Sequence, residues 1–476
     1  MTALKACIVG GGVGGLACAS FLRRHDVEVT LVEAAPLFGG LASGLTAGGL
    51  AFDGGPYILL DRPGLAWAFA ELGMELETEL SLRRVGFVYE VRGEGAPPVK
   101  VFGDLDETVS GLEASFPGSA APYRRFIEDM RVANARLRPL LTHESPGAMA
   151  ALRTGAFRAL PLLLASLGGV LERTGLAAPV RHALAIWTPI AGQDMATAPS
   201  PLAFVPALIH SEGCYVPVGG VAAVATRLEA RARELGATLR ARSKVSTIRV
   251  ADGRVTGVAL ESGEEIEADI VVSNAGGVGT LLELVPGASG MDDYVEGLPL
   301  QSPGVAAFLA TRAPGTGTPY MKFWRADEDA EAPCRLLVQP SALDGSPSGD
   351  RVAARVIAPL SHAISTALAA DGQQKLLDRL LGEERLSAEL GSFEVLERRT
   401  PRTYGSANHL YKDSMNPVMT AAFMRKGRLP HRLATPRGLY LVGSATHPGQ
   451  WVSFCAISGI LGAKKALRDH RIELRT

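Results

Sequence analysis

Three glycines near the start of the chain have the spacing that lets a backbone hold a pyrophosphate group. Residues 10–15 satisfy the pattern Gly-x-Gly-x-x-Gly at Gly10, Gly12 and Gly15. The first glycine permits a tight strand-to-helix turn, the second a close approach of the anion, and the third close packing of helix on strand. The helix N-terminus that follows offers free N–H groups and a partial positive charge. This chemistry predicts a dinucleotide site.

An acidic residue completes this motif. Residues 5–9 and 27–33 have the composition of strands, and residues 14–25 have that of a helix between them. The carboxylate of Glu33, at the end of this strand–helix–strand unit, can accept hydrogen bonds from a ribose diol and repels a 2′-phosphate. Glycines at this spacing are a weak signal by themselves, and the ordered strands, helix and acid make the prediction specific.

A second pair of glycine turns follows the acid-ended strand. Residues 38–41 are Phe-Gly-Gly-Leu, and residues 52–57 are Phe-Asp-Gly-Gly-Pro-Tyr. A simple nicotinamide-binding domain does not require these turns. They suggest that the chain surrounds a longer ligand, a flavin dinucleotide. An ordinary surface hairpin is the alternative interpretation.

A strand, a glycine turn and a helix are predicted near the C-terminus. Residues 439–442 and 452–467 have the composition of a buried strand and a helix, and Gly-Ser-Ala-Thr-His-Pro-Gly-Gln-Trp joins them at 443–451. The N-terminus of this helix can face a flavin ring, where its dipole stabilises negative charge on the reduced ring. His447 is the best candidate for handling a proton, and a turn or core histidine is the alternative.

The composition excludes several classes of protein. The chain has 476 residues, of which 47% are hydrophobic and 20% charged, so it is not disordered and can form two large domains or three small ones. The net charge is −1 and no basic block is present, which argues against a nucleic-acid binder. Five widely spaced cysteines include no Cys-x-x-Cys pair. We therefore expect no metal site and a cytoplasmic location.

Three uncharged segments imitate export or membrane signals. Residues 6–22 resemble a signal peptide, but the glycines of residues 10–15 are poor for a signal helix. Residues 438–463 carry no charge, but a polar turn interrupts them. Residues 156–173 contain an uncharged stretch too short to span a bilayer. We expect this last segment to be a core helix, or a helix that faces a membrane or forms a lid.

These motifs together resemble the flavin amine oxidase-like superfamily, most closely the bacterial phytoene or carotenoid desaturases. The resemblance covers nearly the whole chain and includes residues 215–220, Tyr-Val-Pro-Val-Gly-Gly, and 268–274, Ala-Asp-Ile-Val-Val-Ser-Asn. It implies an α/β fold, with a Rossmann-like FAD-binding domain of discontinuous segments, an inserted α+β substrate domain and a helical subregion. The expected boundaries are 1–100, 208–290 and 432–476 for the FAD-binding domain, and 101–207 and 291–431 for the substrate-binding domain.

The resemblance also implies the residues that contact FAD, which would be held without a covalent link. The first glycine motif would hold the pyrophosphate, Glu33 the adenosine ribose and Val245 the adenine, while residues 449–452 would face the isoalloxazine ring. The full expected set is Gly10, Gly12, Val13, Gly14, Gly15, Glu33, Gly39, Gly40, Leu41, Gly55, Pro56, Tyr57, Val245, Asn274, Gly443, Ser444, Gly449, Gln450, Trp451 and Val452.

Two positions depart from the pattern of the family. Leu41 stands where the family usually has Arg or Lys, so a cationic contact is missing or supplied elsewhere. Trp451 stands where the family continues with small residues, and its indole would reshape the pocket next to the flavin. We expect substrate specificity to depart from that of a standard carotenoid desaturase at these positions.

The implied activity is FAD-dependent desaturation of an apolar, isoprenoid or carotenoid-like substrate by hydride transfer to flavin N5, with oxygen or a quinone as electron acceptor. His447 is the catalytic candidate, Trp451 a candidate pocket residue, and peripheral contact with the inner face of a membrane a further expectation. Two alternatives remain open: an amine or specialised-metabolite oxidase, for which Lys322 is the lysine to examine, and a non-catalytic, prenyl-binding escort-like protein. The intact motifs at both ends argue against the last.

Overall fold

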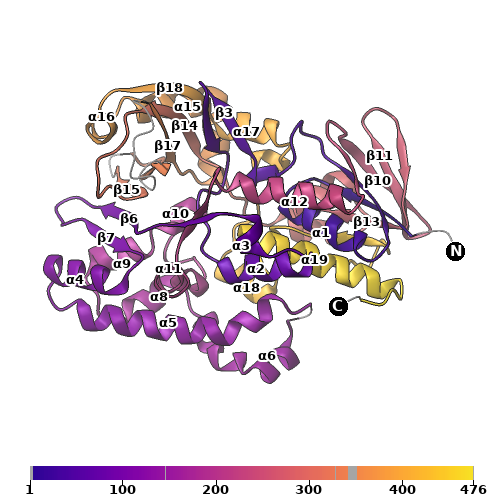
Figure 1. The fold of residues 1–476 in the computed structure, drawn as a ribbon, viewed down its shortest axis with the longest axis horizontal. Coiled ribbons are helices and arrows are strands. Elements are labelled where there is room, and N and C mark those ends of the chain that lie inside the picture. The colour runs from indigo at the N-terminus through magenta and orange to yellow at the C-terminus, as the bar shows by residue number, and fades with distance from the viewer. Residues whose placement is uncertain (1–3, 145, 327–328, 341–350, 475–476) are drawn as a thin grey trace.

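A five-stranded parallel sheet forms the centre of one half of the molecule (Figure 1). The structure is a computed structural model that describes residues 4–144, 146–326, 329–340 and 351–474. In spatial order, the strands of the parallel sheet are β19 (Leu439–Leu441), β13 (Ile270–Ser273), β1 (Lys5–Val9), β2 (Glu28–Val32) and β9 (Thr238–Arg240). The sheet thus joins segments from the beginning, middle and end of the chain, and the predicted α/β class with a Rossmann-like domain is confirmed.

Both faces of this sheet are covered. Ala6 and Ile8 of β1 pack into a core with helices, whereas Cys7 and Val9 face a small antiparallel sheet. Burial on both faces explains why β1 is apolar at successive positions. The helices are α1 (Val13–Arg23), α2 (Arg62–Glu71), α12 (Ala222–Glu234) and α19 (Val452–Asp469), and the antiparallel strands are β10 (Val245–Ala251), β11 (Arg254–Leu260) and β12 (Glu265–Glu267).

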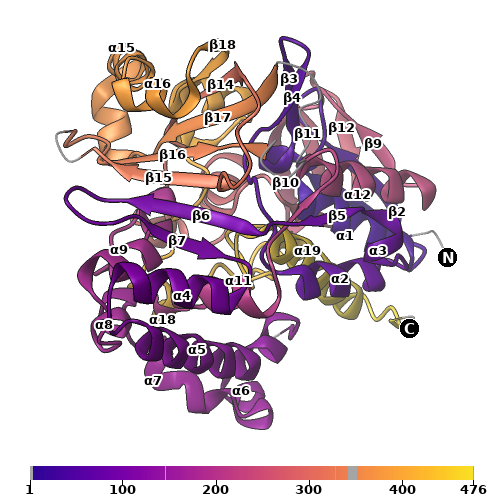
Figure 2. The ribbon, with the colours of Figure 1, turned by 60° about the vertical axis from the view of Figure 1, so that its left-hand side comes forward.

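A seven-stranded mixed sheet forms the other half. In spatial order its strands are β18 (Phe393–Arg399), β14 (Val305–Thr311), β17 (Val352–Ala358), β16 (Cys334–Val338), β15 (Met321–Arg325), β6 (Phe87–Arg92) and β7 (Val99–Phe102). Figure 2 shows α15 (His362–Leu381) and α16 (Glu384–Leu390) above this sheet and a helical lobe below it. The predicted boundary at residue 100 assigns β6 to the cofactor domain, but β6 pairs with β15 in this second sheet.

The helical lobe supplies the larger part of the core under the second sheet. Its helices are α4 (Leu105–Ser115), α5 (Ala120–Leu141), α6 (Ala148–Thr154), α7 (Leu160–Leu163), α8 (Leu167–Glu172), α9 (Ala178–Leu184), α10 (Trp187–Ile190) and α11 (Phe204–Ser211). The remaining strands and α-helices are β3 (Gly44–Ala47), β4 (Leu50–Asp53), β5 (Leu82–Arg84), β8 (Tyr215–Pro217), α3 (Leu76–Glu79), α13 (Gly277–Gly279), α14 (Asp292–Glu296), α17 (Pro401–Ala407) and α18 (Ala421–Lys426).

The expectation of one helix over residues 156–173 is wrong. The segment contains a short 3-10 turn followed by α7 and α8, and Ser166 between them pairs with Pro199. Pro161 and the glycine pair Gly168-Gly169 disfavour a continuous helix here. Proline lacks the backbone N–H that a helix hydrogen bond needs, and glycine adds conformational freedom to the unfolded chain. The two ends of this segment also differ in burial: Phe157 is exposed, whereas Leu171 is fully buried.

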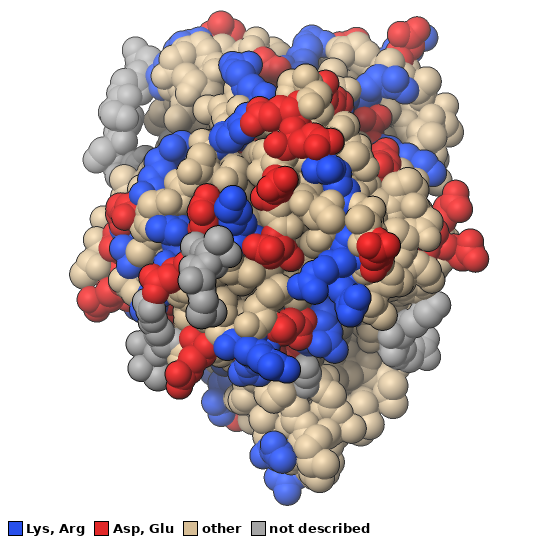
Figure 3. Space-filling view, turned by 90° about the vertical axis from the view of Figure 1, so that its right-hand side faces the viewer, with Lys and Arg blue, Asp and Glu red and all other residues tan. Residues whose placement is uncertain are grey.

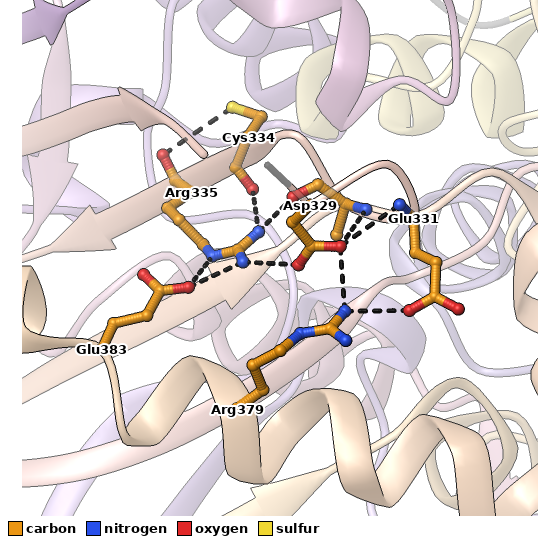
Figure 4. A network of polar contacts seen from close by, with 7 residues as sticks. Asp329, Glu331, Cys334, Arg335, Arg379 and Glu383 are labelled. Atoms are coloured by element: carbon orange, nitrogen blue, oxygen red, sulfur yellow. Dashed lines mark hydrogen bonds and ion pairs between the residues drawn. The ribbon is translucent and has the colours of Figure 1, made fainter. Parts of the chain in front are cut away.

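A network of ion pairs fastens the second sheet to the helices above it (Figure 4). Arg335 of β16 is 1% exposed, and its guanidinium bonds to Asp329 and Glu383, each at 2.7 Å. Arg379 of α15 bonds to Asp329 at 2.9 Å and to Glu331 at 2.8 Å. Two carboxylates thus neutralise a guanidinium that is taken out of water, as buried charges require.

Candidate functional site

A cavity of about 840 Å³ is lined by residues of both main sheets. It includes Val9 and Val32, which end β1 and β2, and Asn274, which follows β13. In open α/β sheets, ligands bind outside the carboxyl ends of the parallel strands. Seventeen of the residues expected to contact FAD line this cavity: Gly10, Gly12, Val13, Gly14, Glu33, Gly39, Gly40, Leu41, Gly55, Pro56, Tyr57, Val245, Asn274, Ser444, Gln450, Trp451 and Val452.

The first glycine motif forms the turn between β1 and α1. Gly10 has a φ of +95°, a conformation that side chains other than glycine rarely adopt. Gly12 precedes α1 without a side-chain cap, so the first N–H groups of the helix remain free for a ligand. A Cβ added at Gly15 would overlap the carbonyl oxygen of Gly10. Close packing of α1 on this turn therefore requires glycine at position 15, and Gly15 does not line the cavity.

Glu33 follows β2 directly, as the sequence predicts. Its carboxylate accepts hydrogen bonds from the backbone N–H of Gly11 at 2.6 Å and of Ala35 at 2.8 Å. A carboxylate has about four acceptor positions, so it can still accept bonds from a ligand. The two backbone bonds fix its orientation at the rim of the cavity.

The second glycine loop packs directly on the first. The N–H of Gly39 donates to the carbonyl of Gly11 at 2.8 Å. A Cβ on Gly40 would lie 3.2 Å from the Cα of Gly12, and Gly39 and Gly40 both have positive φ. The contact therefore depends on glycine at several positions, and it continues the glycine-lined wall toward Leu41, which also lines the cavity.

The C-terminal segment reaches the same wall from the other side. The Asn274 side chain lies among several glycines: its Nδ2 would be 2.8 Å from a Cβ on Gly12, and its Oδ1 would be 2.6 Å from one on Gly14. Gly443 packs against Asn274, and its N–H donates to Ser458 of α19 at 2.9 Å. Gly443 and Gly449 lie behind the cavity wall, whereas Ser444 lines it.

The N-terminus of α19 opens into the cavity at Trp451 and Val452. The indole of Trp451 stacks on Phe454 with 4.9 Å between ring centroids, and it packs against the core below the second sheet. The aromatic ring therefore forms part of the cavity wall. The free N–H groups of the helix give this place a partial positive charge.

His447 lies apart from the cavity wall. Its Nε2 is 2.9 Å from the carbonyl oxygen of Leu140 in α5. Burial, followed by the charges of His431 and Arg428, lowers the pKa of His447 to about 4, so the ring is neutral at neutral pH. The imidazole links the turn to α5, and this placement does not favour its expected role in catalysis.

Lys322 is also remote from the cavity. Its ammonium pairs with Glu389 at 2.7 Å, and neither residue belongs to the cavity wall. The lysine singled out for an amine oxidase therefore pairs β15 of the second sheet with α16, away from the cavity.

Asp61 is a buried carboxylate that sequence reasoning missed. It lines the cavity and accepts hydrogen bonds from Ser453 of α19 at 2.9 Å and from Arg138 of α5 at 2.7 Å. It also caps α2 through the N–H of Gly64 at 3.2 Å. An aspartate before Pro63 is a recognisable helix-start signal, but its contacts with α5 and α19 depend on the tertiary fold.

Together these features fit a flavin dinucleotide. Two glycine loops pack so closely on each other and on Asn274 that Cβ atoms would clash, so backbone lines this part of the cavity. A helix N-terminus is free at each end of the chain. Glu33 presents a carboxylate next to the first loop. These groups match a diphosphate, a ribose and a ring that gains negative charge on reduction.

Comparisons with known proteins agree with this architecture. Residues 8–71 match the NAD(P)-binding Rossmann-like domain family. The chain is 27% identical to hydroxyneurosporene desaturase of Rubrivivax gelatinosus, over 97% of this chain and 92% of that one. It is 26% identical to the lycopene-forming phytoene desaturase of a Paracoccus species, over 98% of this chain and 96% of that one.

Solved structures share the fold. An oxidoreductase from Methanosarcina mazei matches 97% of this chain and 100% of its own, with a TM-score of 0.65 and 18% identity. A putrescine oxidase matches 99% of this chain and 100% of its own, with a TM-score of 0.63 and 16% identity. The chain is thus similar over nearly its full length to phytoene and carotenoid desaturases, and it shares its fold with the two solved oxidoreductase structures.

Proposed function

We propose that the chain is an FAD-dependent oxidoreductase that desaturates an apolar, isoprenoid- or carotenoid-like substrate. The observation that carries this proposal is the continuity of one cavity from the glycine loops and Glu33 to apolar side chains of the second half. Those side chains include Trp187, Ile190, Leu202, Val205 and Ile357. A mostly apolar cavity with a few fixed polar groups suits a lipid-like ligand.

FAD held there would accept a hydride from one carbon of the substrate while a neighbouring carbon loses a proton. The residues of the chain orient the reactants and exclude water. Asp61 holds Ser453 in the first turn of α19 and thereby fixes that helix N-terminus against the cavity. Trp451 and the apolar wall exclude water from the same place, which strengthens the effect of the helix N–H groups.

Anaerobic reduction of the purified protein tests this proposal. We expect flavin absorbance that bleaches with an acyclic polyene and does not bleach with a small amine such as putrescine. Protein without flavin absorbance would contradict the cofactor. Bleaching by the amine alone would contradict the desaturase and favour amine oxidation. Addition of oxygen or a quinone to the reduced protein would then identify the electron acceptor.

We also propose that residues 149–164 contact a membrane surface. Met149, Leu152, Phe157, Leu160 and Leu164 are 48% to 62% exposed. Figure 3 shows mixed charges over one side of the molecule and a largely uncharged lower end, at the height where Figure 1 places α6. In the described part of the chain, no helix has the length and apolarity to cross a bilayer. A surface contact would cover this patch.

Sedimentation with phospholipid vesicles tests the membrane contact. The double substitution Phe157→Ser and Leu160→Ser should reduce the vesicle-bound fraction several-fold, because it removes apolar side-chain area that would enter the lipid. The matched control is the double substitution Val218→Ser and Val250→Ser, at two exposed residues outside this segment. It should leave vesicle binding unchanged. Equal losses in both double variants, or no binding by the original chain, would contradict the proposal.

A further inference from the structure

Two arginines stand side by side on the face of the second sheet that lines the cavity. Arg355 of β17 and Arg399 at the end of β18 flank Phe308 of the intervening strand β14. The guanidinium carbons lie 5.3 Å and 4.8 Å from the centroid of the Phe308 ring. Arg399 also lies over the ring of Tyr404 at 4.1 Å, and both arginines and Tyr404 line the cavity.

The hydrogen-bonding groups of this cluster are largely unused. Arg355, which is 8% exposed, donates from Nη1 to the carbonyl oxygens of Asp53 at 3.1 Å and Gly55 at 2.8 Å. Its Nε and the hydroxyl of Tyr404 are buried without a hydrogen-bond partner. Among the described residues, the guanidinium of Arg399 contacts aromatic rings and forms no hydrogen bond or ion pair.

In the described part of the chain, no carboxylate forms an ion pair with either guanidinium, although Asp53 acts on the charge of Arg355 and Glu397 on that of Arg399. Asp53 directs its side chain to the backbone N–H of Ala222 at 3.2 Å, and burial raises its pKa to about 6. Glu397 lies on the same strand as Arg399 and lines the cavity, where its charge raises the pKa of Arg399. Glu397 is exposed, and among the described residues it forms no ion pair with Arg399. Burial, followed by the charge of Arg355, lowers the pKa of Arg399 to about 9, so the shift reflects first the cost of taking this cation out of water and then its repulsion by Arg355.

Arg335 shows how this fold treats a buried arginine that has only a structural role. Its guanidinium is paired with Asp329 and Glu383 in the network described above (Figure 4). Buried charges are ordinarily paired because desolvation of an unpaired charge is costly. Arg355 and Arg399 differ from Arg335 in facing a cavity, where a ligand can supply the missing negative charge.

We propose that Arg355, Arg399 and Tyr404 bind a carboxylate group of the substrate, which makes the substrate an apolar acid and not a pure hydrocarbon. The proposal rests on the proposed function, because it names the chemical class of that substrate. A guanidinium presents paired N–H donors that match a carboxylate, and a tyrosine hydroxyl adds a third donor. The apolar wall at Trp187 and Ile357 would hold the hydrocarbon part.

The diphosphate of the cofactor is the other anion that could approach these arginines. It is expected at the N-terminus of α1, where the glycine loops already leave free N–H groups. The two sources give different results when Arg399 is replaced. Loss of a substrate contact leaves flavin content unchanged, whereas loss of a cofactor contact lowers it.

Binding of all-trans-retinoic acid and its alcohol, retinol, to the flavin-loaded protein tests the proposal. Quenching of tryptophan fluorescence reports binding without turnover, since Trp187 and Trp451 line the cavity. We expect the acid to bind at least about tenfold more tightly than the alcohol, because hydrogen bonds to a charged group are strong. R399Q should remove this preference and leave the affinity for retinol and the flavin content unchanged, whereas Y404F should reduce the preference only in part.

Arg398→Gln is the matched control. Arg398 is the neighbouring residue on β18, is exposed and pairs with Asp378 of α15, so R398Q should keep the preference for the acid. Equal affinity of the original protein for acid and alcohol would overturn the proposal, as would loss of flavin from R399Q. Failure of the desaturase function appears separately, as absence of bleaching by any polyene, and does not alter these binding measurements.

Discussion

Gly459 of α19 lies against the backbone of Gly14 in α1, so closely that a Cβ at Gly459 would overlap the carbonyl oxygen of Gly14. Gly14 in turn is close to the turn at Gly443, whose Cα would be 3.1 Å from a Cβ at Gly14. The last helix of the chain is therefore held directly on the helix that begins the first glycine motif. This contact sets the distance between the two helix N-termini that face the cavity.

Gly459→Ala should disturb this helix contact. We expect the free energy of unfolding to fall by about 1–3 kcal/mol, because the added methyl group forces the two backbones apart. Denaturant titration measures this change, and flavin release during the titration shows whether the site opens with it. Gly111→Ala on α4 is the control: its Cβ would have no neighbour within 4 Å, so a small gain in stability is expected. Equal stability of G459A and the original chain would contradict the tight contact.

Glu33→Ala should weaken binding of FAD and leave binding of FMN unchanged. FMN lacks the adenosine ribose that Glu33 is expected to contact, so the pair of ligands isolates this carboxylate. We expect at least about a tenfold loss of FAD affinity, from the loss of hydrogen bonds to a charged acceptor. Titration of the flavin-free protein by fluorescence quenching measures both constants. An equal loss of affinity for FMN would show that the substitution disturbs the first glycine loop, and it would contradict a contact between Glu33 and the ribose.

His431 should make the protein sensitive to acid. The ring is 5% exposed, its Nδ1 bonds to the carbonyl of Leu441 at 2.9 Å, and burial lowers its pKa from 6.5 to about 4. The unfolded state therefore binds a proton below pH 6.5 that the folded state resists. Stability is lost as pH falls from about 6.5 toward 4, by up to about 3 kcal/mol for this residue.

His431→Gln should flatten this part of the pH profile. Glutamine can still donate to Leu441 and carries no titratable group. Urea unfolding at several pH values between 7.5 and 4.5 measures the slope. A slope identical to that of the original chain would assign the acid sensitivity to other groups, such as His447 and His210, whose pKa values are also lowered to about 4.

Trp451→Ala should enlarge the cavity, because the indole forms part of its wall. We expect the ratio of kcat/KM for a long polyene to that for a short one to rise several-fold, because the indole no longer limits the length that fits. Trp67→Ala on α2 is the control, since that indole contacts Lys464 and does not line the cavity. An unchanged ratio in W451A would remove Trp451 from the determinants of specificity.

The cofactor half was predictable because its signals are local. The first glycine motif, the helix after it and Glu33 lie within about 30 residues, so the chemistry of each follows from its neighbours in the chain. The structure has β1 at Lys5–Val9, as predicted, and both glycine loops contact one another. The positive φ of Gly10 and the packing of Gly15 also agree with the roles assigned to them from spacing.

What only the tertiary structure decided is which distant side chains meet. Asp61 and Ser453 are far apart in sequence, yet they share a hydrogen bond at the cavity, and Arg355 and Arg399 become neighbours only because β14 lies between their strands. The orientation of the His447 side chain likewise depends on α5, because its ring nitrogen bonds to the carbonyl of Leu140 in that helix. A sequence pattern records local backbone preferences, whereas side-chain contacts and buried charge depend on which elements pack together.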